Sequence, residues 1–277
     1  MCELMGMCFA HPIPADFSIR EFALRDVENA DGWGLAWYPD RSLALVKEPI
    51  SWQASPFTGF LQTYQRLVSS IYVAHVRHRT VGGVPTHADT HPFARELYGR
   101  EYCFAHNGTV KALAERFLLG RYRPLGSTDS EYAFCHIMED LALRASSVLD
   151  EPDDFRWLHA KLSTVNQDGK LNVLLSDGRR LFAYRDMAGH KGLTVRQLRL
   201  KSAEPRQLED REMRVELAGD FPNHGFVIAT RPLNDRTWHD LHPGELIVFA
   251  DGSVSFSSHR DPASKEFGAV SSGQIAR

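Results

Sequence analysis

Cys2 is the residue whose place in the chain offers the most chemistry. It follows Met1, so removal of Met1 would place a thiol and a free α-amino group on one residue. A free α-amine has a pKa of about 7.7–8.0 and a free thiol one of about 8.5, so the amine can accept the thiol proton, directly or through one water. N-terminal nucleophiles are activated in this way. The alternative interpretation is that a small residue at position 2 merely permits removal of the methionine.

Arg77 lies in the first of three polar clusters, His75-Val76-Arg77-His78-Arg79-Thr80. A guanidinium at the end of a buried strand is costly unless it meets a carboxylate. Its planar fork suits bidentate binding of that group. The cluster therefore predicts either a site for a substrate carboxylate or a structural ion pair.

Asn107 lies in the second cluster, His106-Asn107-Gly108, which follows the apolar run 102–105. An asparagine carboxamide beside a glycine backbone N–H can aim two donors at one point, which is the composition of an oxyanion hole. The alternative is a plain turn, because Asn-Gly is a common hairpin dipeptide.

Asp129 lies in the third cluster, Ser127-Thr128-Asp129-Ser130-Glu131. Serine or threonine followed by an acid in the first helical turn is typical of an N-cap. A carboxylate in this cluster can also bind a substrate ammonium group. Capping by one residue does not exclude binding by another.

Metal and disulfide sites are not expected. His87 and His91 are spaced like metal ligands, but they lie in a loop with Pro85 and Pro92, and no third ligand follows at a recognisable spacing. The four cysteines contain no CxxC pair and are too few for a disulfide framework in 277 residues.

The elements that position these clusters follow from hydrophobic spacing. Apolar residues at i, i+3, i+4 and i+7 predict helices over 19–27, 57–68 and 154–165, and one that begins at Thr128 or Asp129. Alternation and turn dipeptides predict strands near 3–10, 31–38, 42–48, 71–76, 102–105, 171–175, 181–184, 193–200, 225–230, 245–249 and 254–256. The strand over 102–105 is expected to stop at His106-Asn107-Gly108, while 81–93 and 201–220 are expected to be loops.

Helices grouped between two blocks of hairpin-linked strands indicate two packed antiparallel sheets covered by helices, an α+β fold. We expect one domain over 1–260 and a polar C-terminal tail over 261–277. The hydrophobic and charged fractions, 43% and 24%, are those of a soluble globular protein. A net charge of -3 argues against nucleic acid as a partner, and no apolar run is long enough for a membrane span. Without a signal peptide, the chain is expected to be a reduced, cytoplasmic protein.

Together these motifs resemble the class II glutamine amidotransferases, a branch of the N-terminal nucleophile (Ntn) hydrolases. The family pattern is an N-terminal Cys, then His-x-Arg-x-x-Thr, His-Asn-Gly and Ser/Thr-Asp-x-Glu. This chain matches it in order and spacing with Cys2, 75–80, 106–108 and 128–131. The segments Asp31-Gly32-Trp33-Gly34, 86–93, 229–233 and 243–246 also look like the small, stand-alone members.

The resemblance implies a four-layer αββα sandwich and a role for each matching residue. Cys2 would attack the side-chain amide of glutamine, with its own amine as base, and water would then resolve a γ-glutamyl thioester. Asn107 and the Gly108 N–H would stabilise the oxyanion. The residues expected to bind the substrate are Arg77 (α-carboxylate), Asp129 (α-ammonium), Thr80, His78 and Trp33. No cofactor and no metal are implied.

Three functions remain open at this point. The first is glutamine hydrolysis, with an ammonia-accepting partner protein. The second is hydrolysis of a γ-glutamyl peptide or amine, as in relatives from glutathione breakdown and ergothioneine synthesis, because only the leaving group would change. The third, from another class, is an inactive regulatory subunit with an intact fold.

Overall fold

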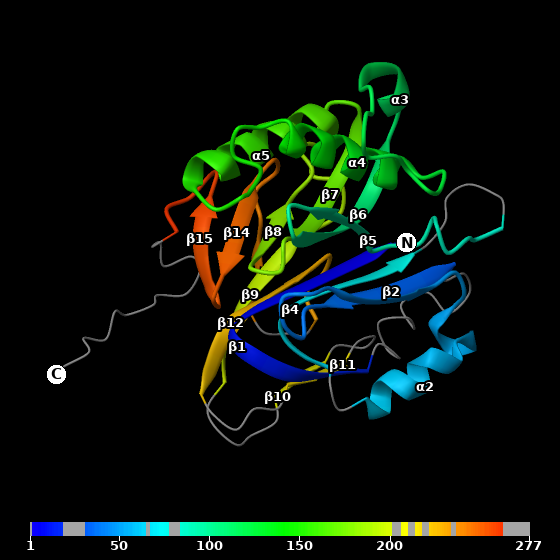
Figure 1. Cartoon of the computed structure of the whole chain (residues 1–277). Coiled ribbons are helices and arrows are strands. Elements are labelled where there is room, and N and C mark those ends of the chain that lie inside the picture. The colour runs from blue at the N-terminus through cyan, green and yellow to red at the C-terminus, as the bar shows by residue number, and fades with distance from the viewer. Residues whose placement is uncertain are drawn as a thin grey trace.

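The computed structural model describes residues 2–18, 31–64, 67–77, 84–200, 206–209, 214–217, 222–233 and 237–262. The described residues form two antiparallel sheets that pack face to face, with helices on the outer sides (Figure 1). The prediction of two packed antiparallel sheets covered by helices is confirmed. No helix among these residues is long and apolar enough to cross a membrane.

The first sheet holds β1 at its centre. Its strand order is β13-β9-β12-β1-β4-β2-β3, and β11 pairs with the far end of β1 and with β10. The strands are β1 (Glu3–Ser18), β2 (Gly32–Trp37), β3 (Ala44–Glu48), β4 (Val68–Arg77), β9 (Thr194–Leu200), β10 (Arg206–Glu209), β11 (Arg214–Leu217), β12 (Asn223–Ala229) and β13 (His239–Asp240).

The second sheet has the order β15-β14-β8-β7-β6-β5. Its strands are β5 (Phe93–Leu97), β6 (Arg100–Val110), β7 (Gly169–Ser176), β8 (Arg180–Tyr184), β14 (Leu246–Ala250) and β15 (Ser253–Ser257). The helices are the 3-10 turn η2 (Trp52–Ala54), α2 (Pro56–Thr63), α3 (Leu113–Arg116), α4 (Asp129–Ala142) and α5 (Pro152–Asn166).

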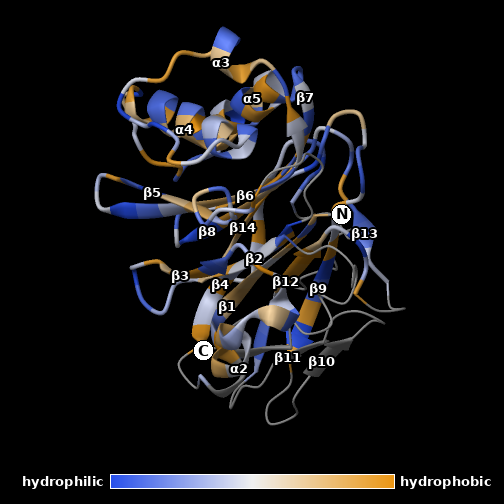
Figure 2. Cartoon of the chain, turned by 90° about the vertical axis from the view of Figure 1, so that its right-hand side faces the viewer, coloured by the Kyte–Doolittle hydropathy of each residue, from blue (hydrophilic) through white to orange (hydrophobic). Residues whose placement is uncertain are grey.

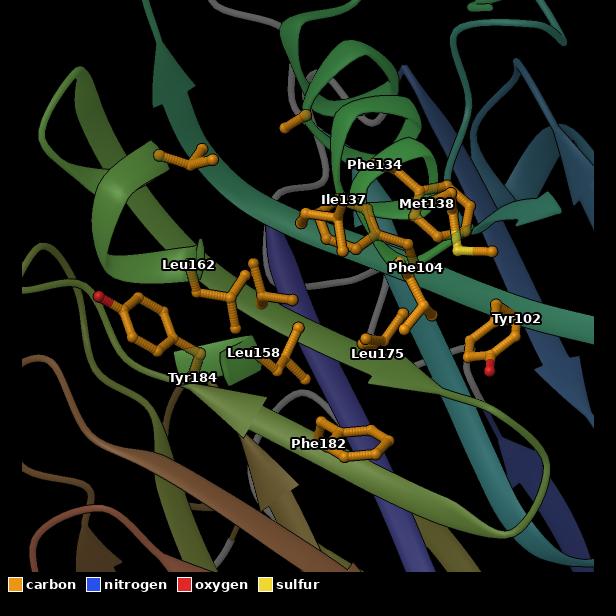
Figure 3. Close-up of a cluster of buried hydrophobic side chains, with 14 of the residues drawn as sticks. Tyr102, Phe104, Phe134, Ile137, Met138, Leu158, Leu162, Leu175, Phe182 and Tyr184 are labelled. Atoms are coloured by element: carbon orange, nitrogen blue, oxygen red, sulfur yellow. The ribbon is translucent and has the colours of Figure 1, made fainter. Parts of the chain in front are cut away.

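Three apolar layers follow from the alternation of side chains along the strands. In β4, Tyr72 faces the outer cluster beneath α2, while Val73 faces the cluster between the two sheets. A third cluster lies between the second sheet and the helices α4 and α5, with Phe104, Phe134 and Leu158 among its members (Figure 3). Figure 2 shows this helix layer on one side of β6 and β8, with β1, β2 and β4 on the other side.

Several predicted boundaries were wrong. The helix expected over 57–68 ends at Thr63, and Val68 already begins β4, which is longer than expected. The chain at 201–220, expected to be a loop, contains the hairpin of β10 and β11. Strand β5 begins at Phe93, the last residue of the expected loop, and no strand was predicted over 93–97. The helix predicted over 19–27 and most of the predicted tail lie outside the described residues.

Phe134 offers a test of the helix layer. Its ring stacks on Phe104 with centroids 5.0 Å apart, and both side chains are fully buried. We expect Phe134→Ala to lower the free energy of unfolding by about 3–5 kcal/mol, because it leaves a cavity beneath α4. Leu143→Ala, at the exposed end of the same helix, should stay within about 0.5 kcal/mol. Urea denaturation of both variants measures the difference, and equal losses would contradict this packing.

Candidate active site

Cys2 differs from the other three cysteines in its access to solvent. Cys8, Cys103 and Cys135 are buried, whereas Cys2 is partly exposed. Burial raises the pKa of the Cys8 and Cys103 thiols to about 12, which keeps both protonated at neutral pH. Since the thiolate is the reactive form, Cys2 is the best-placed nucleophile of the four.

The strand register brings Cys2 and Arg77 to the same end of the first sheet. Glu3 pairs with Val76 and Leu4 with His75, so continuing the antiparallel register by one residue sets position 2 opposite Arg77. Leu4 and Cys8 lie in the cluster between the sheets. Because side chains alternate along a strand, Cys2 lies on the same face as these two residues and is directed toward the second sheet.

Asn107 meets Cys2 from that second sheet. It lies in β6, where Cys103 and Ala105 also face the space between the sheets. Its Nδ2 donates a hydrogen bond of 2.7 Å to the Cys2 carbonyl oxygen. A carboxamide nitrogen carries two hydrogens, so one N–H remains for a ligand beside Cys2. Figure 1 shows the N-terminal end of the chain between the two sheets, near β5 and β6.

Gly108 follows Asn107 within the same strand. The prediction that the strand stops at His106 was wrong, as was the alternative of a turn, because β6 continues to Val110 and pairs with β7. A Cβ at position 108 would lie 2.0 Å from the Lys170 carbonyl oxygen of β7. Only glycine permits this close approach of the two backbones.

His106 anchors the opposite face of the same strand. Its Nδ1 lies 2.8 Å from the Ser130 Oγ of α4, and its Nε2 lies 3.0 Å from the Lys170 carbonyl oxygen. Burial lowers the pKa of His106, although the Asp129 carboxylate partly opposes this. A neutral ring with both nitrogens engaged joins α4 to the strand that carries Asn107.

Asp129 is the first residue of α4, and the N-cap is Thr128, whose Oγ1 accepts a 3.2 Å hydrogen bond from the Glu131 N–H. The Asp129 carboxylate accepts hydrogen bonds from the Val110 N–H at 2.6 Å and the Ser130 N–H at 2.9 Å. These bonds fix the carboxylate at the end of β6, three residues beyond Asn107. A carboxylate has about four acceptor sites, so capacity remains for an ammonium group.

Arg77 ends β4, and its Nη1 is buried with no hydrogen-bond partner among the described residues. A buried guanidinium nitrogen without a partner is costly, which favours a ligand carboxylate at this position. Asp89 is a charged neighbour: burial would raise its pKa, but hydrogen bonds from Ser127 and Thr86 and the charge of Arg77 lower it overall.

The segment 84–92 packs against the first sheet and against the loop before α4. A Cβ at Gly34 of β2 would lie 2.1 Å from the His91 carbonyl oxygen, so glycine is required there. Asp89 Oδ1 accepts a 2.6 Å hydrogen bond from the Ser127 N–H. Lys47 Nζ donates to the Thr90 carbonyl oxygen at 2.7 Å. The segment 84–92 therefore connects the first sheet to the loop before α4, at the end of the sheet where Cys2 lies.

Trp33 requires a correction, because its side chain is fully buried in the cluster beneath α2 and packs edge-on against Trp52 at 4.7 Å. On this evidence it belongs to the core and not to the substrate site. His78 and Thr80 lie outside the described residues. His91 packs against His75 with ring centroids 4.2 Å apart and ring planes tilted by 34°. Within the described ranges, no three His, Cys, Asp or Glu residues are grouped so as to hold a metal ion.

Lys191 is a site residue that the sequence analysis missed. Its Nζ lies 3.4 Å from the Cys2 carbonyl oxygen and 3.4 Å from Asn107 Oδ1. The only local signal is the loop composition Gly189-His190-Lys191-Gly192, which predicts a turn and no particular chemistry.

The architecture is that of the Ntn hydrolases, with the candidate nucleophile at the start of a central strand of one of two stacked antiparallel sheets. A sequence model for "Glutamine amidotransferases class-II" matches residues 1–270. The chain therefore belongs to the class II glutamine amidotransferases, and the predicted family is confirmed.

Individual relatives agree with this assignment. The chain is 33% identical to the Escherichia coli protein named "Putative glutamine amidotransferase YafJ", over 91% of this chain and 98% of the relative. A crystal structure titled "predicted glutamine amidotransferase" from Pseudomonas aeruginosa superimposes with a TM-score of 0.69 and 28% identity, covering 92% of this chain and all of that one. The glutamine phosphoribosylpyrophosphate amidotransferase of Bacillus subtilis shares the fold, with a TM-score of 0.60 and 16% identity, covering 92% of this chain and 48% of that one.

The buried histidines predict how stability depends on pH. Burial lowers the pKa of His91 well below 6.5, with the charges of His75, His106, Arg77 and Lys47 adding to the effect. The unfolded chain therefore binds a proton more readily than the folded one below about pH 6.5. The contribution of His91 to stability is complete above that pH and is lost as the pH falls.

We expect the free energy of unfolding to fall from pH 7.5 to 5.5, by up to about 1.4 kcal/mol per pH unit for each such histidine. Among the described residues neither ring nitrogen of His91 has a hydrogen-bond partner, so His91→Phe removes the titration and should flatten the profile. His239→Gln, at an exposed position, is the control. Urea denaturation at each pH gives the slopes, and a His91→Phe slope equal to that of the wild type would exclude this cause.

Proposed function

We propose that this protein is a glutaminase-type amidohydrolase in which Cys2, after loss of Met1, hydrolyses the side-chain amide of glutamine. The single observation that carries the proposal is the 2.7 Å hydrogen bond from Asn107 Nδ2 to the Cys2 carbonyl oxygen. It brings a carboxamide donor from one sheet to the candidate nucleophile of the other.

The reaction would proceed in two stages. The Cys2 α-amine accepts the thiol proton, and the sulfur adds to the amide carbon to give a tetrahedral oxyanion beside Asn107 and Gly108. Collapse of this intermediate breaks the C–N bond, and the protonated amine gives its proton to the departing ammonia. Water then attacks the γ-glutamyl thioester, which releases glutamate and restores the thiol.

Free glutamine carries a carboxylate and an ammonium group on its α-carbon, so its site needs a cation and an anion. Arg77 offers a buried Nη1 that no described residue binds, and it lies level with Cys2 in the sheet register. Asp129 is held by backbone N–H groups at the end of β6. These positions support the assignment of Arg77 to the carboxylate and Asp129 to the ammonium group.

Cys2→Ala tests the nucleophile. We expect the variant to release no glutamate from glutamine, whereas Cys135→Ala, on the buried face of α4, should keep most of the activity. Intact mass before and after treatment with 6-diazo-5-oxo-norleucine shows whether Met1 is absent and whether one adduct forms. Loss of that adduct in Cys2→Ala assigns it to Cys2.

The same assay should include γ-glutamyl peptides and amines. Turnover of these compounds without turnover of glutamine would replace the proposed substrate with a γ-glutamyl one. A Met1-free protein that acts on neither class and takes up no adduct would contradict the proposal.

Asn107→Ala tests the oxyanion donor. Loss of one such donor typically lowers kcat by about 10²–10³. We expect a loss of this size with KM changed much less, because the donor acts mainly on the charge that develops in the transition state. Steady-state kinetics with glutamine measure both constants. Asn172→Ala is not a suitable control, because the Asn172 side chain is buried and donates a hydrogen bond to the His190 carbonyl oxygen. An Asn107→Ala variant in which only KM changed would assign Asn107 to substrate binding instead.

A further inference from the structure

The loop between β8 and β9 places a lysine ammonium against both residues of the proposed nucleophile site. Lys191 Nζ lies 3.4 Å from the Cys2 carbonyl oxygen and 3.4 Å from Asn107 Oδ1. Lys191 has a φ of 52°, in the left-handed region that residues other than glycine seldom adopt. Such a conformation persists where the surroundings hold it in place.

Asp186 helps to keep the backbone at Lys191 in this conformation. Its side chain is fully buried, and Oδ2 accepts a 2.8 Å hydrogen bond from the His190 N–H, next to Lys191. Its Oδ1 accepts from Asn166 Nδ2 at 2.7 Å and from the Leu171 N–H at 2.8 Å. The carboxylate therefore connects the loop to α5 and to β7.

Asn172 holds the same loop from the other side. It lies in β7 directly opposite Asn107 of β6, and its Nδ2 donates to the His190 carbonyl oxygen at 2.7 Å. Both backbone groups of His190 are thus bound by buried side chains. The position of Lys191 is set by the strand that also pairs with Asn107.

We propose that Lys191 is a positioning residue of the nucleophile site, which orients the Asn107 carboxamide and holds it against Cys2. An ammonium group can only donate hydrogen bonds, so it selects the carboxamide orientation in which Oδ1 faces Lys191. Nδ2 is then directed to the Cys2 carbonyl oxygen, with its second N–H available to an oxyanion. The effect of Lys191 on catalysis rests on the proposed function. Its effect on the orientation of Asn107 rests on the described contacts alone.

Without the ammonium, the carboxamide can turn and present its oxygen to the oxyanion. We expect Lys191→Met to lower kcat by about 10–10²-fold with KM changed less than about twofold, a smaller loss than removal of the donor itself. Lys191→Arg keeps a cationic donor and should retain more activity than Lys191→Met. Lys111→Met, at an exposed lysine just beyond β6, is the charge-matched control and should behave as the wild type.

A double-mutant cycle with Asn107→Ala separates positioning from general structural damage. If Lys191 acts through Asn107, Lys191→Met should cause no further loss of kcat in the Asn107→Ala background. Equal losses in both backgrounds would overturn the inference. Should Lys191→Met fail to fold, Lys191→Gln enters the same cycle.

A crystal structure of the Lys191→Met protein gives a readout that needs no activity. We expect the Asn107 carboxamide to turn or to leave the Cys2 carbonyl oxygen, and an Asn107 that keeps its 2.7 Å contact would overturn the inference. The two proposals can therefore fail separately. A wild-type protein without turnover rejects the proposed function, while an unmoved Asn107 rejects the role of Lys191.

Discussion

The hydrogen bond between the Asn107 carboxamide and the Cys2 carbonyl oxygen joins two sheets at the point where the candidate site lies. Its 2.7 Å length depends on both strand registers, because a one-residue shift in either β1 or β6 would turn one partner to the opposite face. The cluster between the sheets, with Leu4 and Ala105 next to the two partners, holds the sheets at the required separation. The packing of the apolar core between the sheets therefore also sets the geometry of the polar site.

The polar residues around the site are held by backbone groups more than by one another. The Asp129 carboxylate accepts from two N–H groups, and the Asp186 carboxylate accepts from two N–H groups and one carboxamide. Thr230, in a segment near the end of the chain, accepts a 2.8 Å hydrogen bond from the Leu4 N–H, while Arg231 forms an ion pair with Glu3. Rigid backbone partners of this kind keep functional groups aligned without movement of long side chains.

The sequence predicted the two-sheet fold for physical reasons that are local, and it also named most of the residues of the candidate site. Apolar alternation located the central strands, and Thr128 and Asp129 carried a helix-start signal that α4 confirms. The end of strand β6 was misjudged because Asn-Gly favours a turn in isolation, whereas here a close approach to Lys170 of β7 requires Gly108 within the strand. The sequence around Lys191 predicted a turn but no role in the site, since its contacts to Cys2 and Asn107 span 189 and 84 residues of sequence. The burial of Trp33 was likewise invisible, because a Gly-Trp-Gly segment does not reveal which face of its strand meets Trp52.

The central place of β1 also has a consequence for biosynthesis. Met5 pairs with Ala229 of β12, so the strand that begins at Glu3 stays without one of its two neighbours until most of the chain has left the ribosome. At about 5–20 residues per second, that interval is on the order of 10–45 seconds. Throughout it β1 can pair with β4 but not with β12, so one edge of the central strand stays open. The end of the first sheet at which Cys2 lies is therefore completed only when β12, one of the last strands to be made, pairs with β1.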